Sequence, residues 1–196
     1  MTDYTQVDHL PTHGRRVVFQ GVEGAYSFGA MKEFFDDTIT SFHVDTWKEA
    51  MEAITKGEAD YAVLPIENST AGIVSDIYDL LVEYPHYIVG EQELPVEHVL
   101  MALPGAKVEE IRTVISHPQA LAQCRRFLDS NENWKTEERL NTAAAAKEVS
   151  ESGDLTMAAV GSPYAAEHFG LQILKEGIFD ARGNTTPVSY THLRAH

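Results

Sequence analysis

Four short loops combine small residues with hydroxyl, amide or imidazole groups, and each leads from an expected strand into an expected helix. They are Gly24-Ala25-Tyr26-Ser27, Asn68-Ser69-Thr70, Ser116-His117-Pro118-Gln119 and Asn141-Thr142-Ala143. In open α/β sheets, ligands bind beyond the carboxyl ends of the strands, where such loops gather. Helix N-termini offer unpaired N–H groups and a partial positive charge, so they bind carboxylates without Lys or Arg. Two such loops from each of two lobes would form a cleft suited to a small dianion.

Each loop also has a purely structural explanation. Ser, Thr, Asn and Asp are preferred at helix N-caps in any α/β protein, and for a single loop capping is the favoured interpretation. The run Glu67-Asn68-Ser69-Thr70 carries more polar groups than a cap needs. Residue types alone therefore leave two classes open, a two-lobed α/β binding protein and an enzyme of the same architecture.

The charge balance limits the possible partners. The chain has 196 residues, with 15 Lys and Arg against 30 Asp and Glu, for a formal net charge of −15. Nucleic acid and anionic membrane surfaces both need a clustered basic footprint, so neither is an expected partner. The acidic exterior also repels small anions at long range. Any anion that the protein binds must therefore be held by local donors.

Other features of the sequence point to a cytoplasmic protein with no disulfide. No apolar run approaches about 20 residues, the length that spans a membrane. The first 15 residues lack the apolar segment of a signal peptide and are expected to form a flexible lead-in. The single cysteine, Cys124, has no internal partner and is expected to pack inside a helix.

The spacing of apolar residues predicts short strands that alternate with helices of about 8 to 12 residues, typical of α/β units around parallel sheets. Lobe 1 is expected over about 16–94 plus 177–186, and lobe 2 over about 95–176. In lobe 1, Ser27 is the expected N-cap of a helix over 28–35. Thr46 and Glu49 form a capping-box pattern for the next helix. In lobe 2, one helix is expected over 119–128.

Metal and nucleotide sites are not expected. His9 and His13 are separated by a proline, and His192 and His196 have helical spacing but lack an acidic third ligand nearby. The run Gly21-Val22-Glu23-Gly24 lacks the full dinucleotide-binding fingerprint, and no Walker Lys-Ser/Thr pair occurs. The sequence therefore predicts no metal and no cofactor.

Three stretches resemble the prephenate dehydratase catalytic domain. They are Val18-Phe19-Gln20-Gly21 followed by Gly24-Ala25-Tyr26-Ser27, the run ADYAVLPIENSTAG at 59–72, and the run SHPQALAQC at 116–124. The resemblance extends over roughly 16–186. It implies the two-lobed fold of type II periplasmic binding proteins, with a ligand cleft between the lobes.

The family converts prephenate to phenylpyruvate by decarboxylating dehydration, in phenylalanine biosynthesis and without a cofactor. By resemblance, Asn68, Ser116 and Gln123 orient the substrate, and Thr142 with the Ala143 amide binds a carboxylate. Thr186 matches the threonine of the family's Thr-Arg-Phe motif, near the leaving hydroxyl. The remaining loop positions expected to bind substrate are Ala25, Tyr26, Ser27, Ser69, Thr70 and His117.

The chain departs from the family after Thr186. Pro187 and Val188 stand where Arg-Phe is expected, and the tail PVSYTHLRAH has no family character. We therefore expect the family's final strand to be missing and residues 187–196 to be a junction artefact. Loss of the arginine removes the strong cation expected near the substrate and predicts weak activity or none.

Neighbouring domains of the family have no counterpart that the sequence reveals. A phenylalanine-sensing ACT domain usually follows the catalytic domain, and many relatives carry an N-terminal chorismate mutase bundle. The 15 residues before Arg16 are too few for that bundle, so we expect a monofunctional form or a shortened start.

Prephenate dehydratase, with prephenate as its small-molecule partner and a homodimer as a possible assembly, is thus the leading hypothesis. The alternatives are an arogenate dehydratase and a non-catalytic protein that binds or senses a small carboxylate on the same fold.

Overall fold

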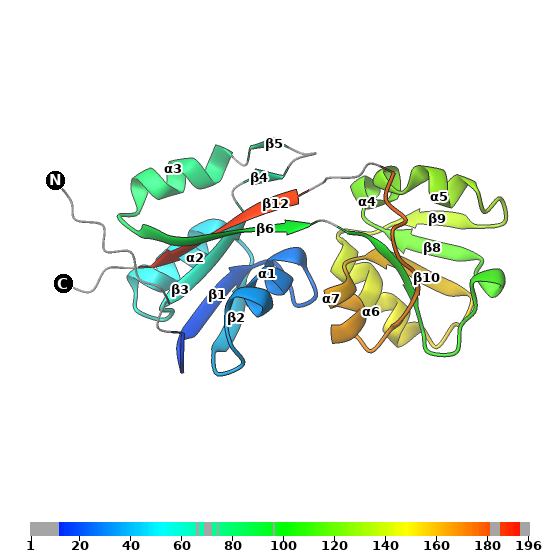
Figure 1. Ribbon diagram of the computed structural model, residues 1–196, viewed down its shortest axis with the longest axis horizontal. Helices are drawn as coiled ribbons and strands as arrows, with labels where there is room; N and C mark the ends of the chain where they lie inside the picture. The colour runs from blue at the N-terminus through cyan, green and yellow to red at the C-terminus, as the bar shows by residue number, and fades with distance from the viewer. Residues whose placement is uncertain are drawn as a thin grey trace.

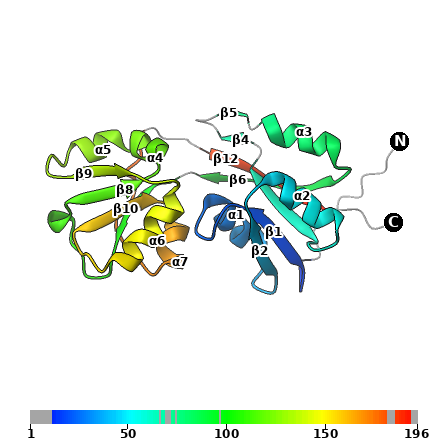
Figure 2. The ribbon, with the colours of Figure 1, turned by 180° about the vertical axis from the view of Figure 1, so that it is seen from behind.

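Two five-stranded sheets organise the protein, one at each end of the molecule (Figure 1). The computed structural model describes residues 12–65, 67–68, 72–73, 75–95, 97–180 and 185–192. Helices pack against each sheet, and the two lobes meet through α1 and α7 (Figures 1 and 2). The two-lobed α/β architecture expected from the sequence is confirmed. No helix in the described ranges is long and apolar enough to cross a membrane.

The sheet of lobe 1 has the order β2-β1-β3-β12-β6. Its strands are β1 (Arg16–Gln20), β2 (Thr40–Val44), β3 (Tyr61–Pro65), β6 (Tyr87–Pro95) and β12 (Thr185–His192). Its helices are α1 (Tyr26–Phe34), α2 (Trp47–Thr55) and α3 (Ser75–Glu83), and a small hairpin joins β4 (Glu67–Asn68) to β5 (Gly72–Ile73). β1 is parallel to β2 and β3, whereas β12 is antiparallel to β3 and β6.

The sheet of lobe 2 has the order β11-β7-β10-β8-β9. Its strands are β7 (Val99–Ala102), β8 (Thr113–Ser116), β9 (Lys135–Glu138), β10 (Met157–Gly161) and β11 (Gln172–Lys175). Its helices are α4 (Pro118–Gln123), α5 (Arg125–Asp129), α6 (Thr142–Ser152) and α7 (Pro163–His168), with a 3-10 turn, η1 (Val108–Glu110). β8 is parallel to β9 and β10, but β7 is antiparallel to β10 and β11. The expectation of parallel sheets is therefore wrong, because one strand in each lobe runs against its neighbours.

Successive residues of a strand point to opposite faces of its sheet, and β1 shows how this builds a core on both sides. Val17 and Phe19 pack on the face covered by α1, against Met31. Val18 packs on the opposite face, against Met51 of α2. All five side chains are at most 2% exposed, so β1 is buried on both faces as its uninterrupted apolar run requires.

The capping-box prediction for α2 is confirmed. The Thr46 hydroxyl accepts from the Glu49 N–H at 3.2 Å, and the Glu49 carboxylate accepts from the Thr46 N–H at 2.8 Å. The prediction for Ser27 is wrong. Ala25 is the N-cap of α1, and Ser27 lies inside the helix, where its hydroxyl donates to the Gln20 carbonyl at 2.7 Å. The Ser27 hydroxyl thus bonds to a backbone carbonyl of β1, whereas the local sequence pattern predicts that it caps the helix.

The helix expected over 119–128 is broken at Cys124, between α4 and α5. A segment distant in the sequence is responsible for the break. The Asp180 carboxylate accepts from the Arg126 N–H at 3.1 Å, and the Asp180 N–H donates to the Gln123 carbonyl at 2.9 Å. These contacts replace helical hydrogen bonds and anchor the segment that returns to lobe 1.

The expected absence of a final strand is also wrong, because residues Thr185–His192 form β12. Its sequence, TTPVSYTH, is rich in β-branched and aromatic residues, which favour strands. The space between β3 and β6 presents backbone groups that must be paired. Pro187 pairs in register with Glu93 of β6, whereas the pairing of β12 with β3 begins only at Val188. Because proline has no N–H to donate, its position outside the pairing with β3 costs that pairing no hydrogen bond.

Candidate active site

A pocket of about 290 Å³ lies where the two lobes meet. It is lined by Tyr26, His98, His117, Gln119, Ala120, Gln123, Leu140, Asn141 and Thr142. Tyr26 comes from α1 of lobe 1 and His98 from the crossing between β6 and β7. The other lining residues belong to α4, its N-cap, and the start of α6 with the two residues before it, all in lobe 2.

Four of the residues expected from the sequence to bind substrate are brought together in this pocket: Tyr26, His117, Gln123 and Thr142. Tyr26, His117 and Thr142 belong to three of the four loops whose composition suggested a cleft, and Gln123 is the last residue of α4. His117 caps α4 by accepting from the Gln119 N–H at 3.2 Å. The capping and binding explanations of these loops are therefore compatible, because capping residues also form the pocket wall.

Other expected site residues are not among those that line the pocket. The Ser116 side chain is fully buried, and its hydroxyl donates to the Val160 carbonyl at 2.6 Å. Ser27 points to Gln20, as described above, and Ala25 is the N-cap of α1. Ala143 is 2% exposed and follows Thr142 in the first turn of α6.

The remaining expected residues fall partly or wholly outside the described part of the structure. Ser69 and Thr70 lie outside the described residues. Only the backbone positions of Asn68 and Thr186 are described: Asn68 pairs with Gly72 in the small hairpin, and Thr186 pairs with Leu94 of β6. Their roles as orienting and donating groups stay predictions.

His98 is a pocket residue that the sequence reasoning missed. It is 3% exposed, and its Nε2 lies 2.9 Å from Gln123 Oε1. Its Nδ1 lies 2.9 Å from the Tyr26 hydroxyl. A single histidine at the start of an apolar strand carries no local signal of a binding site, because both partners come from distant segments.

The pocket presents neutral hydrogen-bonding groups. Burial lowers the pKa of His98, against the opposing effect of its hydrogen bond with Gln123, so the imidazole is neutral at pH 7. Burial likewise raises the pKa of Tyr26 well above its ordinary value. Arg139, just before the pocket residue Leu140, is engaged by Glu148 through two contacts of 2.5 and 2.7 Å.

The N-terminus of α6 adds the partial positive charge of the helix. Asn141 caps it by accepting from the Ala144 N–H at 2.7 Å. Thr142 is the first helical residue, so its hydroxyl and the first amides of α6 lie beside the pocket. Together with the Gln123 amide, these donors suit a carboxylate without a formal cation.

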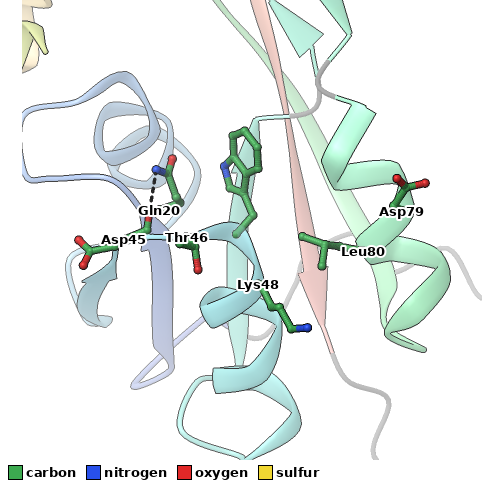
Figure 3. Close-up of a pocket in the computed structure, with 7 residues that line it drawn as sticks. Gln20, Asp45, Thr46, Lys48, Asp79 and Leu80 are labelled. Atoms are coloured by element: carbon green, nitrogen blue, oxygen red, sulfur yellow. Dashed lines mark hydrogen bonds between the residues drawn. The ribbon is translucent and has the colours of Figure 1, made fainter. Parts of the chain in front are cut away.

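A larger pocket, of about 520 Å³, lies within lobe 1 between the start of α2 and α3 (Figure 3). Its polar groups do not suit a dianion. Asp45 and Asp79 line it, and the lining cation Lys48 forms an ion pair with Glu83 at 3.5 Å. The Gln20 amide is already bonded to the Asp45 carbonyl at 3.1 Å. The smaller pocket between the lobes is thus the better candidate for anion chemistry.

A metal centre and a reactive thiol have no support in the part of the chain that the structure describes. No group of three His, Cys, Asp or Glu side chains there could hold a metal ion. Cys124 is fully buried, and burial raises the pKa of its thiol to about 12. The packing role expected for Cys124 is confirmed by its place in the core of lobe 2.

The prephenate dehydratase family model matches residues 17–187. Arogenate dehydratase 1 of Petunia hybrida is 43% identical over 185 residues, which cover 93% of this chain and 43% of the relative. The bifunctional chorismate mutase/prephenate dehydratase of Escherichia coli (strain K12) is 35% identical over 184 residues, covering 92% of this chain and 47% of the relative. The chain thus spans less than half the length of these curated relatives.

Solved structures agree with the two-lobed fold. The prephenate dehydratase of Arthrobacter aurescens, in complex with L-Phe, superposes with a TM-score of 0.80 at 28% identity, covering 92% of this chain and 61% of that one. GqqA, described as a novel type of quorum quenching acylase, gives a TM-score of 0.83 at 37% identity, covering 93% of this chain and 65% of that one.

Proposed function

The chain belongs to the prephenate dehydratase family, and from this premise we propose that it catalyses the decarboxylating dehydration of prephenate to phenylpyruvate. The observation that carries the proposal is the convergence of Gln123, Thr142 and the α6 N-terminus on one pocket between the lobes. These neutral donors suit a substrate with two carboxylates inside a protein of net charge −15.

The proposed reaction places modest demands on the protein. The bond between the ring and its carboxylate breaks, and that electron pair enters the ring as CO₂ leaves. The ring C–O bond breaks in concert, the ring becomes aromatic, and the departing hydroxide takes up a proton to become water. The enzyme needs only to hold the dianion in position and to supply a hydrogen bond or proton at the leaving oxygen.

We assign these tasks to groups from both lobes. Gln123 and Thr142 hold a carboxylate from the side of lobe 2, with the first amides of α6. Thr186, on β12 of lobe 1, donates a hydrogen bond toward the leaving hydroxyl, as the family motif implies. A threonine hydroxyl is a weak acid, so it acts as a donor or a relay and not as a strong general acid.

Pro187 stands where the family motif has arginine, and this predicts weak turnover by the chain as written. A guanidinium beside the substrate would supply charge-assisted hydrogen bonds, about twice as strong as neutral ones. The neutral donors described above remain. We therefore expect the absence of the arginine to reduce the rate of turnover more than it weakens substrate binding.

Arogenate is a second candidate substrate. It differs from prephenate in carrying an amino group in place of the keto group, and the ring chemistry is unchanged. The observation that favours it is the 43% identity to a relative named arogenate dehydratase, compared with 35% to the bifunctional prephenate enzyme. A cytoplasmic location and a homodimer stay predictions, since one relative of 43% identity is named as chloroplastic.

The assay compares the unmodified chain with the double variant Pro187→Arg/Val188→Phe. Each is given prephenate, with phenylpyruvate detected by its ultraviolet absorbance, and in parallel arogenate, with phenylalanine detected by chromatography. We expect weak or undetectable turnover by the unmodified chain and at least about tenfold more by the variant, since one charge-assisted hydrogen bond is worth about 1.5 kcal/mol or more. A folded variant that binds either substrate but never turns it over would refute the enzyme and favour a binding protein.

A further inference from the structure

We propose that His98 is a positioning residue, which fixes the Gln123 side chain so that its amide NH₂ faces the pocket. Gln123 then presents a hydrogen-bond donor, and not its oxygen, to the substrate. The inference rests on the proposed function, because it concerns how that site presents its donors.

His98 is held on all sides by groups of the site and of the segments that link the lobes. Its Nε2 lies 2.9 Å from Gln123 Oε1, and its Nδ1 lies 2.9 Å from the Tyr26 hydroxyl. The rings of Tyr26 and Phe179 flank the imidazole, each with its centroid 5.9 Å away. With 3% of its surface exposed, the imidazole has little freedom to rotate.

The chemistry of these partners assigns the imidazole proton. Gln123 Oε1 can only accept, so His98 Nε2 carries the hydrogen and donates to it. The neutral ring then has a lone pair at Nδ1, which accepts from the Tyr26 hydroxyl. The Tyr26 hydroxyl also donates to the Glu97 carbonyl at 2.9 Å, so its single hydrogen is shared between that oxygen and His98 Nδ1.

The orientation of Gln123 follows from this assignment. Once its oxygen is bound by His98, the nitrogen is the free end of the amide, and Gln123 lines the pocket. An unanchored amide could turn and present its oxygen to a substrate carboxylate, which would repel it. His98 therefore selects the donating face of Gln123.

The same hydrogen bonds join the two lobes. Tyr26 belongs to α1 of lobe 1, Gln123 ends α4 of lobe 2, and His98 lies in the crossing between the sheets. A shift of one lobe relative to the other would stretch the contact between Tyr26 and His98. Correct presentation of the Gln123 amide is thus tied to the relative position of the two lobes.

Two substitutions separate the contact of His98 with Gln123 from its contact with Tyr26. In His98→Gln, the side-chain nitrogen reaches the position of Nε2 and keeps a donor toward Gln123. In His98→Asn, the shorter amide can keep a partner for Tyr26 but loses the contact with Gln123. His43→Asn, at an exposed position on β2, controls for loss of a histidine.

The measurement is kcat and KM for prephenate, in the more active of the unmodified chain and the Pro187→Arg/Val188→Phe variant. We expect His98→Asn to raise KM about tenfold or more, the equivalent of one hydrogen bond to a charged group, with kcat within about threefold. His98→Gln and His43→Asn should each leave KM within about threefold. In a Gln123→Ala background, His98→Asn should add less than about twofold, because it acts through that amide. Equal losses in His98→Asn and His98→Gln, or a loss that persists without Gln123, would overturn the proposal.

A spectroscopic readout keeps this inference separate from the proposed activity. ¹⁵N chemical shifts of His98 report which ring nitrogen carries the proton, whether or not prephenate is turned over. The Nε2–H tautomer at pH 7.5 supports the positioning role even if the protein proves not to be a dehydratase. The Nδ1–H tautomer would refute the positioning role even in an active enzyme.

Discussion

Ser162→Ala should weaken the contact between the lobes by a predictable amount. Ser162 is fully buried at the N-cap of α7, where its hydroxyl accepts from the Ala165 N–H at 3.0 Å. The same hydroxyl donates to the Gly24 carbonyl of lobe 1 at 2.8 Å. Alanine removes both bonds and leaves the buried Gly24 oxygen without that donor.

The magnitude follows from the two contacts. Loss of an N-cap costs about 1 kcal/mol, and a buried acceptor left unpaired costs about 1–3 kcal/mol. We expect the free energy of unfolding to fall by about 2–4 kcal/mol. For a chain of this size, 1 kcal/mol shifts the melting temperature by about 2–4 °C, so the expected decrease is about 4–16 °C.

Thermal unfolding followed by circular dichroism tests this expectation. Ser150→Ala is the matched control, because Ser150 lies on α6 and its hydroxyl donates only to the Lys147 carbonyl, on the exposed side of the helix. The control should change the melting temperature by less than about 1 °C, since surface substitutions are usually close to neutral. An equally small change for Ser162→Ala would show that the contact between Ser162 and Gly24 does not stabilise the lobe interface.

Three further outcomes follow from the same structure. Gly29→Ala places a Cβ in steric overlap with the Tyr164 ring, so urea unfolding should show a loss of about 1–3 kcal/mol, whereas stabilisation would contradict the α1–α7 packing. Asn141→Ala removes the cap on the Ala144 N–H, so it should cost about 1 kcal/mol in urea unfolding and raise the KM for prephenate. Asn141→Ser, which keeps a capping oxygen, should retain most of the stability and stay close to the original KM. Cys124, with its thiol pKa raised to about 12, should react with a thiol reagent at pH 8 only after unfolding, and rapid labelling of the native protein would contradict its burial.

Local patterns predicted those parts of the site whose contacts are local. Thr46 and Glu49 are three residues apart, and their reciprocal capping needs nothing else from the chain. The loops that carry Tyr26 and Thr142, and the helix α4 that carries Gln123, follow strands whose carboxyl ends face the cleft, so sheet topology brings these residues together.

Contacts between distant segments account for the errors. Ser27 matches an N-cap by type, but β1 supplies a tertiary acceptor for its hydroxyl. The helix expected through Cys124 is interrupted because Asp180, far along the chain, bonds to its backbone. His98 was missed for the same reason, since both of its partners come from other elements.

Strand β12 shows a different limit of prediction from sequence. Comparison with a family motif detects the missing arginine, but a sheet constrains the backbone more than the side chains. Residues that favour extended structure can occupy the position between β3 and β6 without matching the motif. Departure from the family at Pro187 therefore predicts altered chemistry better than it predicts a lost strand.

The most direct test of the anion site is calorimetric titration of prephenate into the unmodified chain and into Gln123→Glu. At about 4 Å and an effective dielectric constant of about 20, two carboxylates repel by about 4 kcal/mol, so the variant should bind at least about 100-fold more weakly. Binding by the unmodified chain together with that loss would support a pocket of neutral donors around Gln123. Equal affinity in both proteins, or no binding by the unmodified chain, would contradict it.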